Sequence, residues 1–350
     1  MRFLFVLLLA CSGISAEPWK RHPIDNSSRG ADGVRLSGRD IVTGWEEGGI
    51  VRVYRYPGAA KVREPWPAET AGRVGSPEDA LFVDLDGDGT MDVLTASEGS
   101  TRALHVHWAP KWRTEVVPAS AGLMQWMFSA PLDAKRIVSA GKNAGAALGI
   151  WELPANAHDV AKWKWTPLRP VGWIMSIVPR DMDGDGDIDI LFSDRRGPRS
   201  GVYWLEAPSW KEHAIGAQGR EVMFISAEGP DIVAAVKKNE IHWFRADGST
   251  EVISTPAETG SVKAVRLADL DMDGKPEIIF SCESTPDGAS GVMGMKRRGE
   301  EWEAFSISGS PGRKYDLIEL ADLDGDGDLD VITCEETTNL GVIWFENPAR

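Results

Sequence analysis

Four short stretches of the chain repeat one pattern of acidic residues with the spacing of a metal-binding loop. In each stretch three carboxylates stand at alternate positions, a glycine follows the third, and a fourth acid comes four residues after the third. The acids are Asp84, Asp86, Asp88 and Asp92; Asp181, Asp183, Asp185 and Asp189; Asp269, Asp271, Asp273 and Glu277; and Asp322, Asp324, Asp326 and Asp330. Oxygen-rich, flexible cages of this kind suit Ca²⁺ better than Mg²⁺. The sequence therefore predicts up to four calcium ions.

A structural role is expected for these ions, because a turn rich in side-chain ligands leaves few coordination positions open to a substrate. The flanking residues are typical of β-strands, whereas an EF-hand requires a helix on each side of its loop. Short runs rich in β-branched residues, such as Val262 to Leu267 and Ile278 to Phe280, precede and follow each set of acids. Each loop is therefore expected to be the turn of a β-hairpin.

The strand that follows the acids recurs in parts of the chain that lack a metal loop. Three further copies begin at Asp40, Arg136 and Asp231, so that seven copies are spaced 42 to 53 residues apart. Most copies continue into a strand that ends in aromatic residues, and several add a strand that opens with tryptophan. Four strands in each of seven repeats predict an all-β fold, a seven-bladed β-propeller.

The first residues after the N-terminal segment are expected to close this ring. Residues 19–24, Trp-Lys-Arg-His-Pro-Ile, match residues 210–215, Trp-Lys-Glu-His-Ala-Ile, yet they precede the first repeat. The chain ends shortly after the third strand of the last repeat, which would leave an unpaired sheet edge. Residues 19–24 are therefore predicted to form the outer strand of the last blade.

These features resemble the FG-GAP/VCBS repeat proteins, whose calcium-loop propellers occur in integrin α subunits and in many secreted bacterial proteins. The most specific matches are residues 84–92, Asp-Leu-Asp-Gly-Asp-Gly-Thr-Met-Asp, and residues 322–330, Asp-Leu-Asp-Gly-Asp-Gly-Asp-Leu-Asp. The Phe-Gly and Gly-Ala-Pro landmarks are absent, so the bacterial VCBS-like branch fits better than the integrin branch. Similar propellers occur in some polysaccharide lyases and in a fungal sugar dehydratase, so the resemblance leaves both a binding and an enzymatic role open.

The acidity of the chain is concentrated in the four loops. The whole chain has 38 basic and 53 acidic residues, and the loops, counting Asp187 and Asp328, contain 18 of the acids. The remainder is nearly balanced, with 38 basic against 35 acidic residues, so a generally acidic surface is not implied. Because no sustained basic patch with interleaved aromatic residues is present, nucleic acid is not expected as a partner.

Residues 1–16 are predicted to be a signal peptide, which leaves residues 17–350 as a single propeller domain. Arg2 precedes an apolar run from Phe3 to Ala10, too short for a membrane span, and small residues lie near Ala16. A secreted or periplasmic protein without a transmembrane span is expected. Residues 8–11, Leu-Leu-Ala-Cys, also resemble a lipobox, so the alternative is a membrane-anchored lipoprotein with its lipid anchor at Cys11.

The two other cysteines, Cys282 and Cys334, occupy nearly matching positions in neighbouring blades. Buried free thiols are favoured, and a disulfide stays open because the compartment is oxidising.

No catalytic residue is assigned from the sequence. HExxH, CxxC, GxSxG and glycine-rich phosphate motifs are absent, and most of the histidines recur at equivalent repeat positions, which indicates a structural role. The function predicted first is a binding or scaffolding module for a glycan or an extracellular protein. The alternative is a polysaccharide lyase or sugar dehydratase with Tyr315 or His213 as base and a nearby Arg or Lys to neutralise the acid group.

The binding site is expected on the face opposite the calcium turns, around the central channel. There the loops of the third to fifth blades contribute basic residues, including Arg195, Arg196 and Lys237, whereas the other blades contribute mainly acids, including Glu46, Glu98 and Glu336. Trp126 and Trp173 fall just before the innermost strands of adjacent blades and are predicted to form a stacking platform for a sugar ring beside these cations. Packing between blades is the alternative for both tryptophans.

Overall fold

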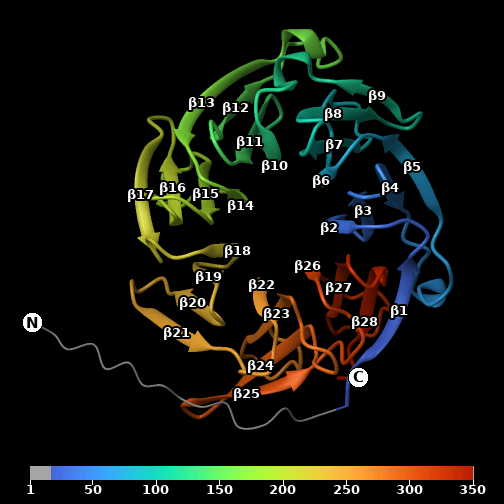
Figure 1. Ribbon diagram of the computed structural model, residues 1–350, viewed down its shortest axis with the longest axis vertical. Coiled ribbons are helices and arrows are strands. Elements are labelled where there is room, and N and C mark those ends of the chain that lie inside the picture. The colour runs from blue at the N-terminus through green and yellow to red at the C-terminus, as the bar shows by residue number, and fades with distance from the viewer. Residues whose placement is uncertain (1–16, 350) are drawn as a thin grey trace, which may run out of the picture.

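Seven four-stranded antiparallel sheets surround one central axis, as Figure 1 shows. The computed structural model describes residues 17–349, so the predicted signal peptide (1–16) and Cys11 lie outside the described residues. The prediction of an all-β, seven-bladed propeller is confirmed. Within residues 17–349, none of the helices has the length and apolar character needed to cross a bilayer.

The first six blades each use four consecutive strands, ordered from the axis outward. Blades 1 to 3 consist of β2 (Ala31–Ser37), β3 (Asp40–Trp45), β4 (Ile50–Tyr54) and β5 (Ala68–Arg73); β6 (Pro77–Val83), β7 (Asp92–Ser97), β8 (Ala103–Trp108) and β9 (Arg113–Val116); and β10 (Gln125–Asp133), β11 (Arg136–Lys142), β12 (Ala147–Glu152) and β13 (Lys164–Pro170).

Blades 4 to 6 follow the same order. They consist of β14 (Ile174–Arg180), β15 (Asp189–Asp194), β16 (Gly201–Glu206) and β17 (Lys211–Gly216); β18 (Val222–Glu228), β19 (Asp231–Val236), β20 (Glu240–Phe244) and β21 (Thr250–Ser254); and β22 (Ser261–Ala268), β23 (Glu277–Glu283), β24 (Val292–Arg298) and β25 (Glu301–Ser306). Three short 3₁₀ helices lie in connections: η1 (Ala59–Lys61), η2 (Pro118–Ser120) and η3 (Val160–Lys162).

The seventh blade joins the two ends of the described chain. It contains β26 (Tyr315–Ala321), β27 (Asp330–Glu335) and β28 (Gly341–Glu346), and β1 (Lys20–Asp25) completes it as the outer strand. In Figure 1, β1 lies along the outside of β28. The predicted closure is confirmed, with the strand starting one residue later because the Trp19 N–H donates instead to the Ile307 carbonyl beyond β25 (2.9 Å).

The distribution of apolar residues follows from the position of each strand within its blade. The second strands β7, β15 and β27 are buried at every position, because each lies inside a sheet whose two faces pack on neighbouring blades. The outer strand β9 is mostly exposed. Cys282 and Cys334 are buried, and no disulfide joins them.

Candidate calcium turns and channel mouth

The four acidic loops join the innermost strand to the second strand in blades 2, 4, 6 and 7. They therefore all lie on one face of the ring. In three of these loops the structure brings carboxylate oxygens of three acids within 4.8 Å of one another. These groups are Asp84, Asp86 and Asp88; Asp181, Asp183 and Asp189; and Asp269, Asp271 and Asp273.

Backbone amides hold these carboxylates in place. In the first loop, the N–H groups of Gly87 and Gly89 donate to the two oxygens of Asp84 at 2.8 and 3.1 Å. The equivalent bonds from Gly184 and Gly186 to Asp181 are 2.7 and 3.1 Å. The loops are thus ordered by local hydrogen bonds, which lowers the entropic cost of gathering several carboxylates around a cation.

The last acid of each loop connects the turn to the rest of the blade. Asp92 accepts from the N–H of Leu85 in its own loop (3.3 Å) and from that of Ala109, just after β8 (2.8 Å). Burial raises the pKa of Asp92 to about 6 and that of the equivalent Asp330 to about 7. An ionised carboxylate at these positions is costly without a nearby positive charge, so a cation in the loop would offset that cost.

The donor set fits calcium. All the converging ligand atoms are carboxylate oxygens, and one oxygen of Asp269 is buried without a hydrogen-bond partner. Hard oxygen ligands on a flexible turn are what Ca²⁺ requires. The residues that would hold the ions are the acids predicted from the sequence.

The third loop, residues 269–277, departs from the others in two ways. Its fourth position is Met272, which adopts a positive φ of 58°, whereas Gly87 occupies the same place in the first loop. A left-handed backbone is unfavourable for a methionine. In addition, the ammonium group of Lys296 pairs with Asp271 and with Asp273 (2.8 Å), where a calcium ion would otherwise bind.

Replacing Lys296 with glutamine should therefore strengthen calcium binding at the third loop. Removal of the ammonium group leaves the carboxylates of Asp271 and Asp273 without their positive partner, so a cation gains their full attraction. Calorimetric titration should show tighter calcium binding at one site of the Lys296→Gln protein. Lys275→Gln, which changes the charge of the same exposed loop equally, is the control and should have a smaller effect; equal effects would mean that only net charge matters.

On the opposite face, three of the predicted binding residues, Trp173, Arg195 and Arg196, come together. Lys142, Arg195 and Arg196 each lie 4.5 Å from the ring centre of Trp173. Glu221 pairs with Arg195 at 2.7 Å, and its carbonyl accepts from the N–H of Lys237 at 2.9 Å. The side chain of Lys237 pairs with Glu283 of the next blade. These four cations span blades 3 to 5, and we call them the basic sector, although each is paired with a glutamate.

Trp126 does not belong to this sector, so the predicted platform of two tryptophans is wrong. Its side chain is fully buried, packs edge to face on Trp165 with 5.3 Å between ring centres, and donates from Nε1 to the Ser120 carbonyl at 3.0 Å. Trp173 is half-buried, but its ring is already covered by cations. Packing is the role that the structure supports for Trp126.

Neither of the two side chains suggested as a base is available at this face. Tyr315 is fully buried, donates its hydroxyl proton to the Pro311 carbonyl (2.8 Å), and has its pKa raised to about 12 by burial. His213 lies on the outer strand β17, stacked on Trp204 and bonded to Glu206. The lyase interpretation is therefore left without either of the residues that were suggested as its base.

The structure adds a cluster of six acids around the end of the channel on this face. We call them the channel-mouth acids. They are Asp32, Glu46, Glu78, Glu98, Asp316 and Glu336. Sequence reasoning placed Glu46, Glu98 and Glu336 on this face but missed the other three, which each occupy the second position of an innermost strand. That common position is the signal that could have identified them.

Three lysines border the channel-mouth acids. Lys142 pairs with Glu98 and with Glu78 (3.9 Å). On the other side, Lys263 pairs with Asp316, and Lys314 pairs with Glu336. Six carboxylates thus face three ammonium groups.

Electrostatic coupling is strong in this cluster. Burial, followed by the neighbouring Asp316 carboxylate, raises the pKa of Asp32 well above its usual range. Burial would also raise the pKa of Asp316, but Lys263, the hydrogen bond with Asp32 and Lys314 together outweigh it and lower that pKa to about 2. Burial likewise raises the pKa of Glu78 strongly, although Lys142 opposes the shift. Around Asp32 and Glu78, the nearby ammonium groups are therefore too few to balance the carboxylates.

Comparison with known proteins identifies the fold but no family. No family model matches the chain, and no curated protein is significantly similar to it. Solved propellers match along nearly the whole chain. BBS1N in complex with ARL6DN has a TM-score of 0.54 and 10% identity over 97% of this chain and 98% of its own.

Two enzymes also match. A streptogramin B lyase has a TM-score of 0.60 and 11% identity, covering 95% of this chain and 99% of its own. The ancestral GH74 enzyme AFV00434 has a TM-score of 0.62 and 10% identity, covering 94% of this chain and 48% of its own. At such low identity these likenesses show a shared β-propeller fold.

Proposed function

We propose that the chain is an exported, calcium-binding β-propeller of the FG-GAP/VCBS type that binds a glycan or a protein partner through the face opposite the calcium turns. The observation that carries this proposal is the set of four equivalent turns with one acidic pattern, three of which bring carboxylate oxygens within 4.8 Å of one another. Structural cations on one face leave the other face free for a partner.

The charges on the opposite face support an anionic ligand. Arg196 has 54% of its side chain exposed and lies at the edge of the basic sector, beside Trp173. An exposed guanidinium can bind a carboxylate or sulfate through two parallel hydrogen bonds. A uronate-containing or sulfated glycan, or an acidic segment of a protein, fits this chemistry.

A binding role is preferred to catalysis because Tyr315 and His213, the bases considered for a lyase, are held in structural contacts. The fold itself does not decide between the roles, since the solved propellers that match include a complex with a protein partner, a lyase and a GH74 enzyme.

The calcium part of the proposal predicts a stability effect that depends on the ion. Asp84→Ala should lower the melting temperature by about 5 °C in calcium and by clearly less after chelation, because the hydrogen bonds from Gly87 and Gly89 are lost in both buffers but the calcium ligand only in the first. Thermal denaturation in both buffers, with bound calcium measured by elemental analysis, is the test. Asp133→Ala removes an acid from the turn of a blade without a metal loop and should respond equally in the two buffers. Equal losses for Asp84→Ala in both buffers would contradict calcium binding there.

The ligand part is tested with neutral, uronate-containing and sulfated polysaccharides. We expect retention of one anionic class on the immobilised protein without release of new reducing ends or unsaturated sugars. Arg196→Gln should weaken that retention, whereas Arg298→Gln, an equal charge change next to the outer strand β25, should not. Release of unsaturated products would establish a lyase instead.

A further inference from the structure

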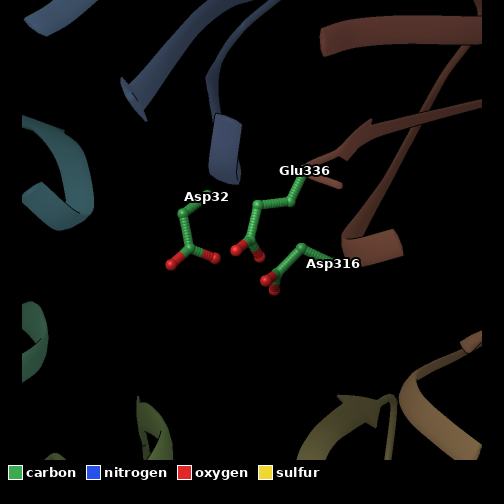
Figure 2. A group of neighbouring side chains, drawn as sticks. All are labelled: Asp32, Asp316 and Glu336. Atoms are coloured by element: carbon green, nitrogen blue, oxygen red, sulfur yellow. The ribbon is translucent and has the colours of Figure 1, made fainter. Parts of the chain in front are cut away.

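Three of the channel-mouth acids converge on one point between blades 1 and 7. Asp32 comes from β2, Asp316 from β26 and Glu336 from the loop after β27, and Figure 2 shows their carboxylates directed toward one another. One oxygen of each lies within 4.8 Å of the others. This group lies on the face opposite the calcium turns and shares no residue with them.

Asp32 is the member of this group whose carboxylate forms no ion pair with a lysine or arginine in residues 17–349. It is 93% buried, since its relative exposure is 7%. Among residues 17–349, no amide, hydroxyl or ammonium group donates a hydrogen bond to its carboxylate, and the polar group within hydrogen-bonding reach is the carboxylate of Asp316. Two carboxylates in contact repel each other unless a proton or a cation lies between them.

The neighbouring lysines supply only part of the missing charge, because each interacts with Asp32 but is ion-paired with another acid. The ammonium group of Lys263 pairs with Asp316, and that of Lys314 pairs with Glu336. Three carboxylates therefore face two ammonium groups in a site with little access to water. A buried charge that lacks a partner destabilises the folded state, so a bound cation would stabilise the protein.

We propose that Asp32, Asp316 and Glu336 bind one hard divalent cation, such as Ca²⁺ or Mn²⁺, at the mouth of the channel. Oxygen-only ligands select these ions over softer metals. Three carboxylates that each offer one oxygen do not fill the six to eight positions that Ca²⁺ takes, so the remaining positions are free for water or for an oxygen of a ligand. The site thereby places a cation on the face where we propose that ligands bind.

Counting bound ions tests this directly, with Mn²⁺ as the probe. After equilibrium dialysis of the full chain against Mn²⁺, elemental analysis should find one ion fewer per chain in Asp32→Asn than in the wild type. Glu47→Gln, which removes an exposed acid on the same face, should bind as many ions as the wild type. Anomalous scattering from Mn²⁺-soaked crystals should show a peak between Asp32 and Asp316.

A second measurement separates loss of the ion from loss of folding. In chelator, Asp32→Asn should melt at a higher temperature than the wild type, because it removes a buried acid that has no donor; in Mn²⁺ this advantage should disappear. Glu336→Gln, whose side chain is 11% exposed, should also lose the ion. Unchanged ion counts in both folded variants would overturn the proposal. Asp84→Ala tests calcium binding at the acidic turns independently of the site at Asp32. The experiments can therefore show which of the two proposals fails.

Discussion

A chain that begins at Asn26, and so lacks β1, should fold poorly or melt at least about 10 °C below the full chain. The truncation leaves the edge of β28 unpaired and removes the stacking of His22 on Trp344 (4.3 Å between ring centres) and the bond from His22 to Glu346 (2.6 Å). Losses of several kcal/mol shift the melting temperature by about 10 °C in a protein of this size. An exposed edge strand also invites aggregation.

β1 connects blades as well as completing one. Trp19 bonds to the Ile307 carbonyl of the sixth blade, and Asp25 accepts the hydroxyl proton of Tyr54 (2.8 Å) in the first. A chain that begins at Pro18 retains these contacts and is the matched control. Circular dichroism and analytical ultracentrifugation should show loss of the cooperative transition or self-association for the shorter chain alone, and a peptide covering residues 18–25 should restore stability. Identical melting curves for the two chains would show that the ring does not depend on this closure.

Trp126→Ala should lower the free energy of unfolding by about 3–5 kcal/mol, the usual range for removing a large aromatic side chain from a core. The Trp126 side chain is fully buried between Trp151 and Trp165, with 5.7 and 5.3 Å between ring centres. The substitution leaves a cavity and also deprives the Ser120 carbonyl of its donor. Urea unfolding followed by circular dichroism is the measurement.

Trp173→Ala is the control, because the two tryptophans lie at the start of equivalent innermost strands but differ in burial. Trp173 is half-buried and contacts cations, an interaction worth about 0.5–2 kcal/mol, so its loss should cost clearly less. Conversely, ligand binding should respond to Trp173→Ala and not to Trp126→Ala in any variant that folds. A stable Trp126→Ala protein with impaired glycan binding would restore the platform that the structure argues against.

The seven repeats could be predicted from the sequence because each repeat carries its own pattern of apolar and acidic residues. Strands such as β7 and β27 lie between packed blades and must be apolar at nearly every position, so their copies stand out. The sixth blade was less regular, since β24 has no aromatic pair at its end, yet the strand after its acidic loop still marked the repeat. Closure by β1 was also predictable, because it repeats the Trp-Lys-x-His pattern of β17.

The pairing of Trp126 with Trp173 failed for a reason of register. Trp126 lies opposite Gly141 in β11, just as Ile174 lies opposite Asp194 in β15, so Trp126 corresponds to Ile174 and stands one position beyond the place of Trp173. Trp173 instead pairs with Lys142 in an isolated bridge. A shift of one residue turns a side chain to the other face of a sheet. Sequence spacing alone cannot resolve a difference of that size.

The sequence by itself determined the number of blades, the ring closure and the four acidic turns, because each depends on residues within one repeat or on a motif copied between repeats. Only the tertiary structure decided which side chains meet at the channel mouth. Asp32 and Asp316 come from opposite ends of the chain and approach each other because closing the ring places blade 7 beside blade 1. Their charge is balanced only in part by Lys263 and Lys314, and that balance depends on distances through space that no local pattern encodes.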